Sequence, residues 1–219
     1  MKKFFKIAID SPAAAGAGTQ AKLIAKHYNL FYLDTGKIYR FIGYEKLKNK
    51  KNFNYKFIKK IIRSLNIKKL DNKNLLSNKV ATEASIVAKD IKIRRIVHFF
   101  QTKCAYNPPK KFNGSILDGR DIASVIVKDA DIKFFITANV KIRASRRLKE
   151  LKSLKRKISY EEVLKSIKKR DKSDYQRKYS PLKKTKDSIL INTSNLTKRS
   201  CFLKIKQIID KKLRINGNL

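Results

Sequence analysis

The sequence predicts an α/β protein in which a central five-stranded parallel sheet is flanked by helices. Short runs rich in β-branched and aromatic residues alternate with longer segments of helical periodicity. Alternating strands and helices are typical of parallel sheets joined by right-handed crossovers. Hydrophobic residues make up 42% of the 219 residues, which is enough to bury the core of one domain with small inserts.

Each expected element follows from its local pattern. The strands are short apolar runs that end at polar residues, and we place them at Phe4–Asp10, Leu30–Asp34, Ser115–Asp118, Asp131–Thr137 and Ser188–Thr193. The helices repeat apolar residues on one face, and we place them at Gln20–Tyr28, Ile38–Lys48, Val80–Gln101 in two pieces, Val140–Leu154, Tyr160–Lys172 and Thr197–Leu213. The Lys-rich stretch 50–78 predicts a short helix and loops, and the tail 214–219 is expected to fray.

The composition excludes some classes of protein. No apolar run approaches the roughly 20 residues that span a bilayer, so a membrane protein is excluded. Cys104 and Cys201 lie far apart in the sequence, which argues against a disulfide framework or a Cys-x-x-Cys metal site. We therefore expect two free thiols and a cytoplasmic location.

The chain is strongly basic, with 55 Lys and Arg against 17 Asp and Glu. A formal charge of +38 favours polyanionic partners, and nucleic acid is the obvious one. The lysines are spread along the whole chain rather than gathered in one segment. We therefore interpret the excess as a compositional bias and rank nucleic-acid binding as the second reading.

A loop of small residues joins the first expected strand to the first expected helix. It consists of Ser11, Pro12, Ala13, Ala14, Ala15, Gly16, Ala17, Gly18 and Thr19. Small residues let backbone N–H groups point at phosphate oxygens, and the following helix N-terminus adds its dipole. The segment therefore predicts an ATP-phosphate loop, with Thr19 at the position of the hydroxyl that binds Mg²⁺.

This loop departs at two positions from G-x-x-x-x-G-K-G-T, a form of the usual pattern G-x-x-x-x-G-K-[ST]. Ser11 replaces the first glycine, and Ala17 replaces the lysine that reaches the β- and γ-phosphates. A preorganised donor of this kind contributes about 3–4 kcal/mol, or roughly 10²–10³ in rate. Lys22 is the nearest lysine after the loop, but it falls about 140° round the helix from Ala17 and is expected to point elsewhere.

Taken in order, the motifs resemble those of bacterial cytidylate kinases. The similar segments are Ile7–Thr19, Tyr32–Arg40, Ala84–Ala88, Asp118–Asp121, Ile167–Asp174, and Arg177 followed by Ser180–Leu182. They cover most of the chain, from about residue 7 to residue 192, and the similarity is weakest at 46–78. The departures at Ser11, Ala14 and Ala17 bear on ATP binding and turnover rather than on the fold.

The resemblance implies the P-loop nucleoside monophosphate kinase fold and the ATP-dependent phosphorylation of CMP and dCMP with Mg²⁺. It implies a single domain over 1–219 with a core at 1–36, 80–140 and 180–213. An insert at about 37–79 would bind the nucleoside monophosphate, and a lid at about 141–179 would close over the donor. Family members are usually monomers, so we expect a monomer.

The resemblance also implies roles for individual residues. Those expected to bind CMP are Thr35, Arg40, Ser85, Arg94, Arg120, Asp121, Arg170 and Asp174. Those expected to be catalytic are Arg120, Arg170, Asp174 and Arg177. The loop from Ser11 to Thr19 would bind ATP together with Arg146, in a lid that also carries Arg143 and Arg147.

The chemistry of these side chains agrees with the resemblance. Cytosine presents an N4 amino donor beside N3 and O2 acceptors, which suit the Asp121 carboxylate, the Arg94 guanidinium and the Ser85 hydroxyl. Arginine binds phosphate bidentately, and phosphoryl transfer needs charge neutralisation more than covalent chemistry. Two alternatives stay open: a kinase for another acceptor such as UMP, and a catalytically weakened P-loop protein that binds nucleotide or RNA.

Overall fold

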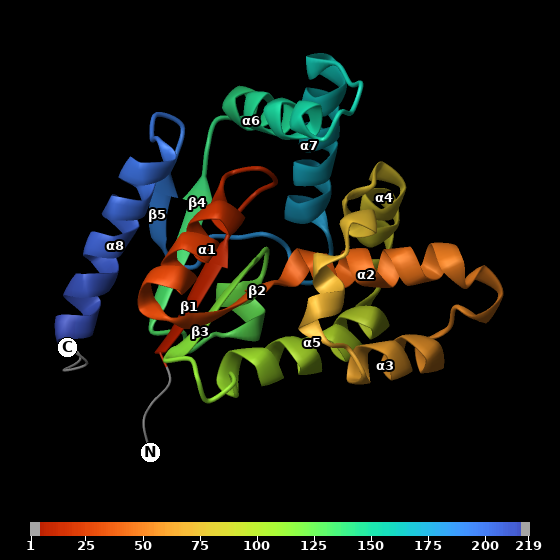
Figure 1. Ribbon diagram of the computed structural model, residues 1–219, viewed down its shortest axis with the longest axis horizontal. Coiled ribbons are helices and arrows are strands. Elements are labelled where there is room, and N and C mark those ends of the chain that lie inside the picture. Colours follow the sequence, from red (N-terminus) through yellow and green to blue (C-terminus); the bar gives the residue numbers. More distant parts are fainter. Residues whose placement is uncertain (1–4, 216–219) are drawn as a thin grey trace.

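Five parallel strands form one sheet in the order β2-β3-β1-β4-β5 (Figure 1). They are β1 (Phe5–Asp10), β2 (Leu30–Asp34), β3 (Gly114–Gly119), β4 (Ile132–Thr137) and β5 (Ile189–Asn192). The computed structural model describes residues 5–215, so the strand position expected at Phe4 and the tail residues 216–219 lie outside it. The predicted five-stranded parallel sheet is confirmed.

The register of the sheet brings three aspartates to its carboxyl edge. Asp10 lies opposite Gly119 at the ends of β1 and β3. Asp34 lies opposite Asp118 at the ends of β2 and β3. Strand β1 lies in the middle of the sheet, with β3 and β2 on one side of it and β4 and β5 on the other. Ligands of open α/β sheets bind at the carboxyl ends of the strands, where the strand order reverses in this way.

Helices follow each strand. They are α1 (Ala17–Tyr28), α2 (Thr35–Lys48), α3 (Tyr55–Arg63), α4 (Asn78–Val87), α5 (Ile91–Tyr106), α6 (Val140–Ser153), α7 (Tyr160–Gln176) and α8 (Lys198–Ile215). Short helical turns are η1 (Lys50–Asn52), η2 (Ile67–Asp71), η3 (Lys73–Leu76) and the π-helical η4 (Ile122–Ile126). Two helices begin three residues earlier than the pattern predicts, α1 at Ala17 and α2 at Thr35.

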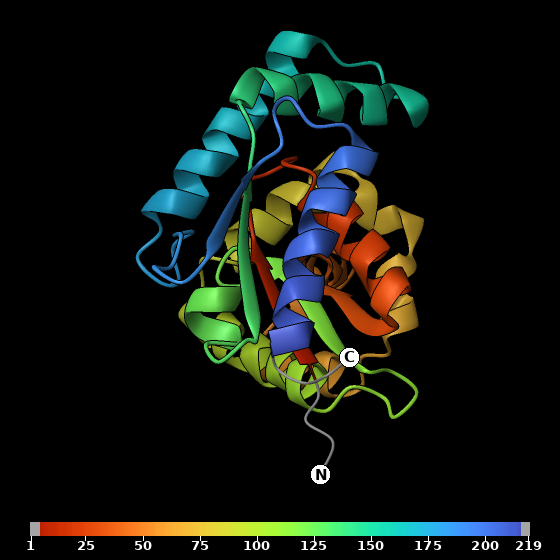
Figure 2. The same ribbon diagram turned by 90° about the vertical axis from the view of Figure 1, so that its left-hand side faces the viewer.

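Two buried clusters cover the two faces of the sheet. On one face, α1 and α8 pack together against the strands through Ile24, Ile205 and Ile209 (Figure 2). On the other face, α5 and η4 lie against β3, and the cluster continues into α2 and α3. Both free cysteines, Cys104 and Cys201, are buried in these clusters.

Two groups of helices flank the carboxyl edge of the sheet. Figure 1 shows α2 to α5 on one side and α6 with α7 above the sheet. The first group is tightly packed, because a Cβ added at Gly43 of α2 would lie 2.8 Å from the Ala84 nitrogen of α4. Of the first group, α2 and α3 fall in the segment expected to form the insert, whereas α5 falls in the expected core. Helices α6 and α7 fall in the segment expected to form the lid, and the bounds 37–79 and 141–179 remain a prediction.

Over residues 5–215, no helix combines the length and the hydropathy needed to cross a bilayer.

Candidate active site

The loop between β1 and α1 is anchored to the neighbouring strand end. The Ser11 N–H donates to the Gly119 carbonyl oxygen at 3.1 Å. Ala14 and Gly16 both have left-handed backbone, with φ of 60° and 92°. This geometry favours glycine, so Ala14 carries backbone strain. The loop still turns directly into α1, whose first residue is Ala17.

Residues from distant elements hold the loop from outside. Arg143 of α6 donates from Nη1 to the Ala13 carbonyl oxygen at 2.9 Å. The Thr193 hydroxyl, just after β5, donates to the Ala15 carbonyl oxygen at 3.0 Å. Asp171 of α7 accepts from the Ala13 N–H at 3.3 Å and pairs with Arg143 at 2.7 Å. The loop is therefore coupled to α6 and α7, and Arg143 acts as its support.

At position 17, the side chain is a single methyl group, which carries no charge. Ala17 is buried in the cluster that also contains Ala21 and Ile24. Lys22 is exposed on the same helix. Position 17 therefore provides no charge for the donor phosphates, as the sequence indicates.

A pocket opens at the carboxyl ends of β2 and β3, between α2, α4, α5 and α7. It is lined by Thr35, Gly36, Tyr39, Arg40, Ala81, Ala84, Ser85, Ala88, Lys89, Arg94, Gly119, Arg120, Asp121, Arg170, Ser173, Asp174 and Arg177. All eight residues expected to bind CMP are among them. Arg177, expected to be catalytic, lines the same pocket.

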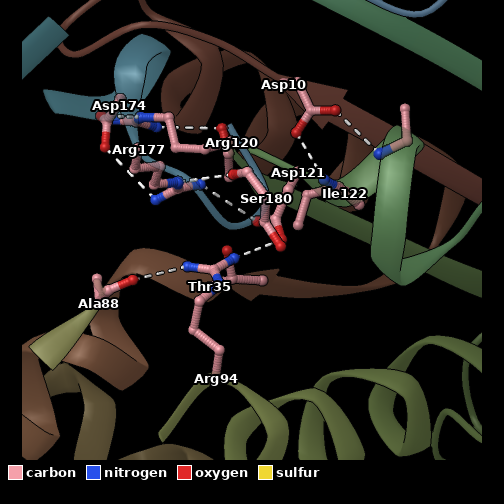
Figure 3. Close-up of polar contacts among 12 residues, drawn as sticks. Asp10, Thr35, Ala88, Arg94, Arg120, Asp121, Ile122, Asp174, Arg177 and Ser180 are labelled. Atoms are coloured by element: carbon pink, nitrogen blue, oxygen red, sulfur yellow. Dashed lines mark hydrogen bonds and ion pairs between the residues drawn. The ribbon is translucent and has the colours of Figure 1, made fainter. Parts of the chain in front are cut away.

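The Asp121 carboxylate lies between two arginines on the floor of this pocket (Figure 3). Arg94 of α5 donates to Asp121 Oδ2 at 2.5 Å, and Arg177 Nη2 lies 3.8 Å from Oδ1. Arg94 also stacks over the Tyr39 ring at 5.5 Å. Arg177 donates from Nε to the Ser180 carbonyl oxygen, which leaves its buried Nη2 without a hydrogen-bond acceptor in the described residues. The pocket therefore holds a buried donor in need of an acceptor.

Asp174 of α7 gathers the remaining arginines. It accepts from Arg120 Nε at 2.8 Å and lies within 3.6 Å of Arg177 and 3.9 Å of Arg170. Burial alone would raise the pKa of Asp174, but the charges of Arg120 and Arg170 outweigh it and hold this pKa below its usual value. Asp174 is therefore ionised and fixes the guanidinium groups in place.

Positive charge exceeds negative charge at the centre of the pocket. Desolvation, followed by the charges of Arg120, Arg40 and Arg147, lowers the pKa of Arg170 to about 10. Its side chain is still 41% exposed, so the repulsion between arginines is the cause that matters for ligand binding. Desolvation and the charge of Arg147 also lower the pKa of Arg40. Such a cluster favours a phosphate, which would relieve the repulsion.

Carboxylates and a hydroxyl lie beside the phosphate loop. Thr19 is exposed in the first turn of α1. A Cβ at the preceding Gly18 would be 3.0 Å from Asp118 Oδ2. Burial and then the charge of Asp34 raise the pKa of Asp118 well above its usual value. Mg²⁺ prefers hydroxyl and carboxylate oxygens and keeps several waters, so Thr19 and Asp118 would fit Mg²⁺, whose charge would favour the ionised form of Asp118.

The other expected lid arginines have separate partners. Arg146 donates to the Thr193 hydroxyl at 2.8 Å and to its carbonyl oxygen at 2.6 Å. Arg147 pairs with Glu150 at 2.7 Å. Its positive charge also repels that of Arg170 in the pocket and contributes to the lowered pKa of Arg170. Arg146 therefore lies beside the loop, and Arg147 lies nearer the acceptor pocket.

Some pocket residues were not singled out from the sequence. Tyr39, Lys89 and Ser173 line the pocket, and the buried Asp10 accepts from the Ile122 N–H, just after the pocket residue Asp121. Tyr39 directly precedes Arg40 in a motif already noted, so its place on one helix turn was available as a signal. Ser173 lies within the similar segment Ile167–Asp174, where no role was given to it, and Lys89 carries no pattern that separates it from the many other lysines.

Comparison with known proteins agrees with this geometry. The family model described as cytidylate kinase matches residues 7–211. The chain belongs to the cytidylate kinase family. It is 40% identical over 214 residues to a cytidylate kinase of Clostridium botulinum, with 94% of each chain covered. It is 39% identical over 211 residues to that of Mesorhizobium japonicum, covering 96% of each chain, and 39% identical over 218 residues to that of Bartonella henselae, covering 98% of this chain and 100% of the relative.

Among solved structures, an uncharacterized protein from Eubacterium ventriosum has a similar fold, with a TM-score of 0.55 and 17% identity. That alignment covers 94% of this chain and 98% of the other. The cytidylate kinase family is a family of phosphotransferases, and the α/β architecture agrees with its P-loop nucleoside monophosphate kinase fold. The family match spans both the loop and the arginine-lined pocket.

Proposed function

We propose that this chain transfers the γ-phosphoryl group of ATP to CMP, giving ADP and CDP. The observation that carries the proposal is the buried Arg94–Asp121 pair, which lies in the same pocket as the arginine cluster around Asp174. One part of the pocket suits a cytosine and the other suits a phosphate. Family membership over residues 7–211 supports the same reaction.

The Asp121 carboxylate would accept a hydrogen bond from the N4 amino group of cytosine. Arg94 and the Ser85 hydroxyl would then donate to N3 and O2. Uracil has a carbonyl in place of the amino group and would face the carboxylate with a second acceptor. A buried polar group left without its partner costs about 1–3 kcal/mol or more, so this arrangement favours CMP over UMP.

The acceptor phosphate would occupy the cluster formed by Arg40, Arg120 and Arg170. An oxygen of this phosphate attacks the γ-phosphorus of ATP in line, and the bond from γ-phosphorus to the bridging oxygen of ADP breaks. The attacking phosphate is already anionic, so no general base is needed. The arginines hold two highly charged phosphate groups in contact and stabilise the negative charge of the transition state.

The donor would lie along the loop from Ser11 to Thr19, with Arg146 beside it. Mg²⁺, when bound at Thr19 near Asp118, supplies charge neutralisation for the donor phosphates. Backbone N–H groups of the loop and the lid arginines would stabilise the negative charge of the donor phosphates, which a lysine at position 17 usually does. We propose dCMP as a second acceptor and a monomer as the active form.

Phosphorus NMR of a mixture of ATP, CMP and Mg²⁺ tests the reaction directly. We expect signals of CDP and ADP to grow in equal amounts and to depend on both substrates. ATP loss without CDP, or no change with folded protein, would overturn the proposal. Neither the UMP kinase nor the nucleotide- or RNA-binding remnant gains support from the family match.

A further inference from the structure

Asp10 is a buried carboxylate at the end of β1, and within residues 5–215 its hydrogen-bond partners are backbone amides. It is 1% exposed. Its two oxygens accept from two successive backbone amides of η4, Ile122 N–H at 2.7 Å and Ala123 N–H at 2.9 Å (Figure 3). The strand that leads into the phosphate loop is thereby tied to the segment that follows Asp121.

The residue that would ordinarily cap η4 is Asp121 itself. Asp121 occupies the N-cap position, and its carbonyl oxygen accepts from Val125 N–H at 2.9 Å. An aspartate at this position usually turns its side chain back to accept from the second or third amide of its own helix, here Ala123 or Ser124, and Asp10 already accepts from Ala123. Here Asp121 makes no such bond, because its carboxylate faces Arg94 and Arg177 in the pocket.

We propose that Asp10 is a positioning residue for cytosine recognition, because it caps η4 in place of Asp121 and so leaves the Asp121 carboxylate free to face the acceptor base. The inference rests on the proposed function, since it assigns Asp121 to the cytosine. Without the Asp10 carboxylate, the backbone amides at the start of η4 would compete with the acceptor base for the Asp121 carboxylate. Asp10 then acts on acceptor binding although it lies outside the pocket.

The capping of η4 by the Asp10 carboxylate depends on pH. Burial raises the pKa of Asp10 to about 7, and the negative charge of Asp121 acts in the same direction. The hydrogen bonds from the Ile122 and Ala123 amides and the positive charge of Arg120 lower this pKa and offset part of the rise. A protonated Asp10 keeps one acceptor oxygen and presents an O–H to the other amide. Asp10→Asn has the same shape and mimics that protonated form at every pH.

The test compares wild type, Asp10→Asn, Asp121→Asn and the double variant, with KM measured for CMP and for ATP. We expect the KM for CMP to rise about tenfold or more in Asp10→Asn, as for loss of a hydrogen bond to a charged group. The KM for ATP should stay near the wild-type value. Because Asp10 acts through Asp121, adding Asp10→Asn to Asp121→Asn should change the KM for CMP little further.

Asp131→Asn is the matched control. Asp131 also accepts a backbone amide at the start of β1, from Lys6 N–H at 2.8 Å, but it lies at the opposite end of the strand from the pocket. It should leave the KM for CMP unchanged. The ratio of the KM for CMP in Asp10→Asn to that in wild type should be largest at about pH 8 and shrink at about pH 6, below the Asp10 pKa of about 7.

Several results would overturn the inference: an unchanged KM for CMP, an equal rise in both KM values, or additive effects in the double variant. If Asp10→Asn does not fold, Asp10→Ser keeps one short acceptor and must show the same selective rise. If wild type fails to phosphorylate CMP, the proposed function fails first. Calorimetric binding of CMP to the same variants then judges the Asp10 inference separately.

Discussion

At the residue scale, the acceptor pocket works by sharing few carboxylates among many arginines. Asp121 forms ion pairs with Arg94 and Arg177. Asp174 forms ion pairs with Arg120, Arg170 and Arg177. Each carboxylate fixes the direction of the guanidinium groups while leaving part of their hydrogen-bonding capacity for a ligand. Removing one carboxylate leaves buried positive charge uncompensated, which is more costly than losing an exposed ion pair.

Asp121→Asn should reduce discrimination between CMP and UMP. The carboxamide can turn an N–H toward the uracil O4, and it loses the charge that accepts from the cytosine amino group. We expect the ratio of kcat/KM for CMP to that for UMP to fall by roughly tenfold to a hundredfold, the worth of one charged hydrogen bond. Asp71→Asn is the control, because Asp71 pairs with Lys37 on the surface. An unchanged ratio in Asp121→Asn would remove the residue from base recognition.

Ala17→Lys should strengthen the donor site. A lysine at this position would restore the cation that the usual loop aims at the β- and γ-phosphates. We expect kcat/KM for ATP to rise by about tenfold or more, within the range of a preorganised donor. Lys22→Ala, on the exposed face of the same helix, checks the present role of the nearest lysine, and we expect little change. If Ala17→Lys brings no gain in a protein that stays folded, another group already fills the lysine's role.

The residues that the sequence singled out for CMP line one pocket, and most of them stand beside a strand end or in a segment similar to the family. Their roles in binding remain a prediction. Thr35, Arg40 and Asp121 were found in this way. Asp10 was not, since a strand-end aspartate looks the same whether it binds ligand or caps a distant turn. Its role depends on a contact across 112 residues of chain, which no local pattern contains.

At the element scale, the acceptor side is built on a close contact between α2 and α4. Gly43 leaves no room for a side chain against the Ala84 nitrogen, and Lys46 pairs with Glu83 across the same interface at 2.8 Å. The contact places Ser85 of α4 in the pocket wall. Acceptor binding therefore depends on how closely the two helices approach.

Gly43→Ala should separate these helices. The added methyl would lie 2.8 Å from the Ala84 nitrogen, so the interface must open. We expect a loss of about 1–3 kcal/mol in the free energy of unfolding, typical of overpacking, and a higher KM for CMP. Lys48→Ala, an exposed position of the same helix, is the control for thermal melts. A melting temperature for Gly43→Ala at or above that of wild type would contradict the close packing.

Most elements could be predicted because their apolar periods are clear, and the five strands of the sheet are confirmed. The exceptions are local. The helix α2 starts at Thr35 because Asp34 caps it, accepting from Lys37 N–H at 3.2 Å. The π-helical η4 was missed, because five residues carry too little periodicity and it is held by Asp10 from another strand.

At the scale of the whole molecule, charge dominates. With 17 acidic residues against 55 basic ones, the formal net charge is +38, which no arrangement of ion pairs within the chain can neutralise. Such an imbalance opposes compaction through self-repulsion, while a polyanionic substrate relieves it locally. The arginines at the pocket are the functional part of this excess in the proposed reaction.

Salt should therefore stabilise the fold. Raising NaCl from about 10 mM to about 0.5 M shortens the screening length several-fold, which weakens repulsion among many lysines more than it weakens the fewer ion pairs. We expect the melting temperature to rise by a few degrees, as for about 1 kcal/mol in a domain of this size. Potassium glutamate at matched ionic strength separates screening from specific chloride binding. A falling melting temperature would mean that the ion pairs outweigh the repulsion.

The central claim is that a cytidylate kinase family member without the loop lysine selects and phosphorylates cytidine nucleotides. The most direct measurement is ADP release in a coupled assay with ATP, Mg²⁺ and separate acceptors CMP, dCMP, UMP and AMP. We predict turnover with CMP and dCMP and little with UMP or AMP. No turnover with any acceptor, or equal turnover with UMP, from protein shown to be folded would contradict the account.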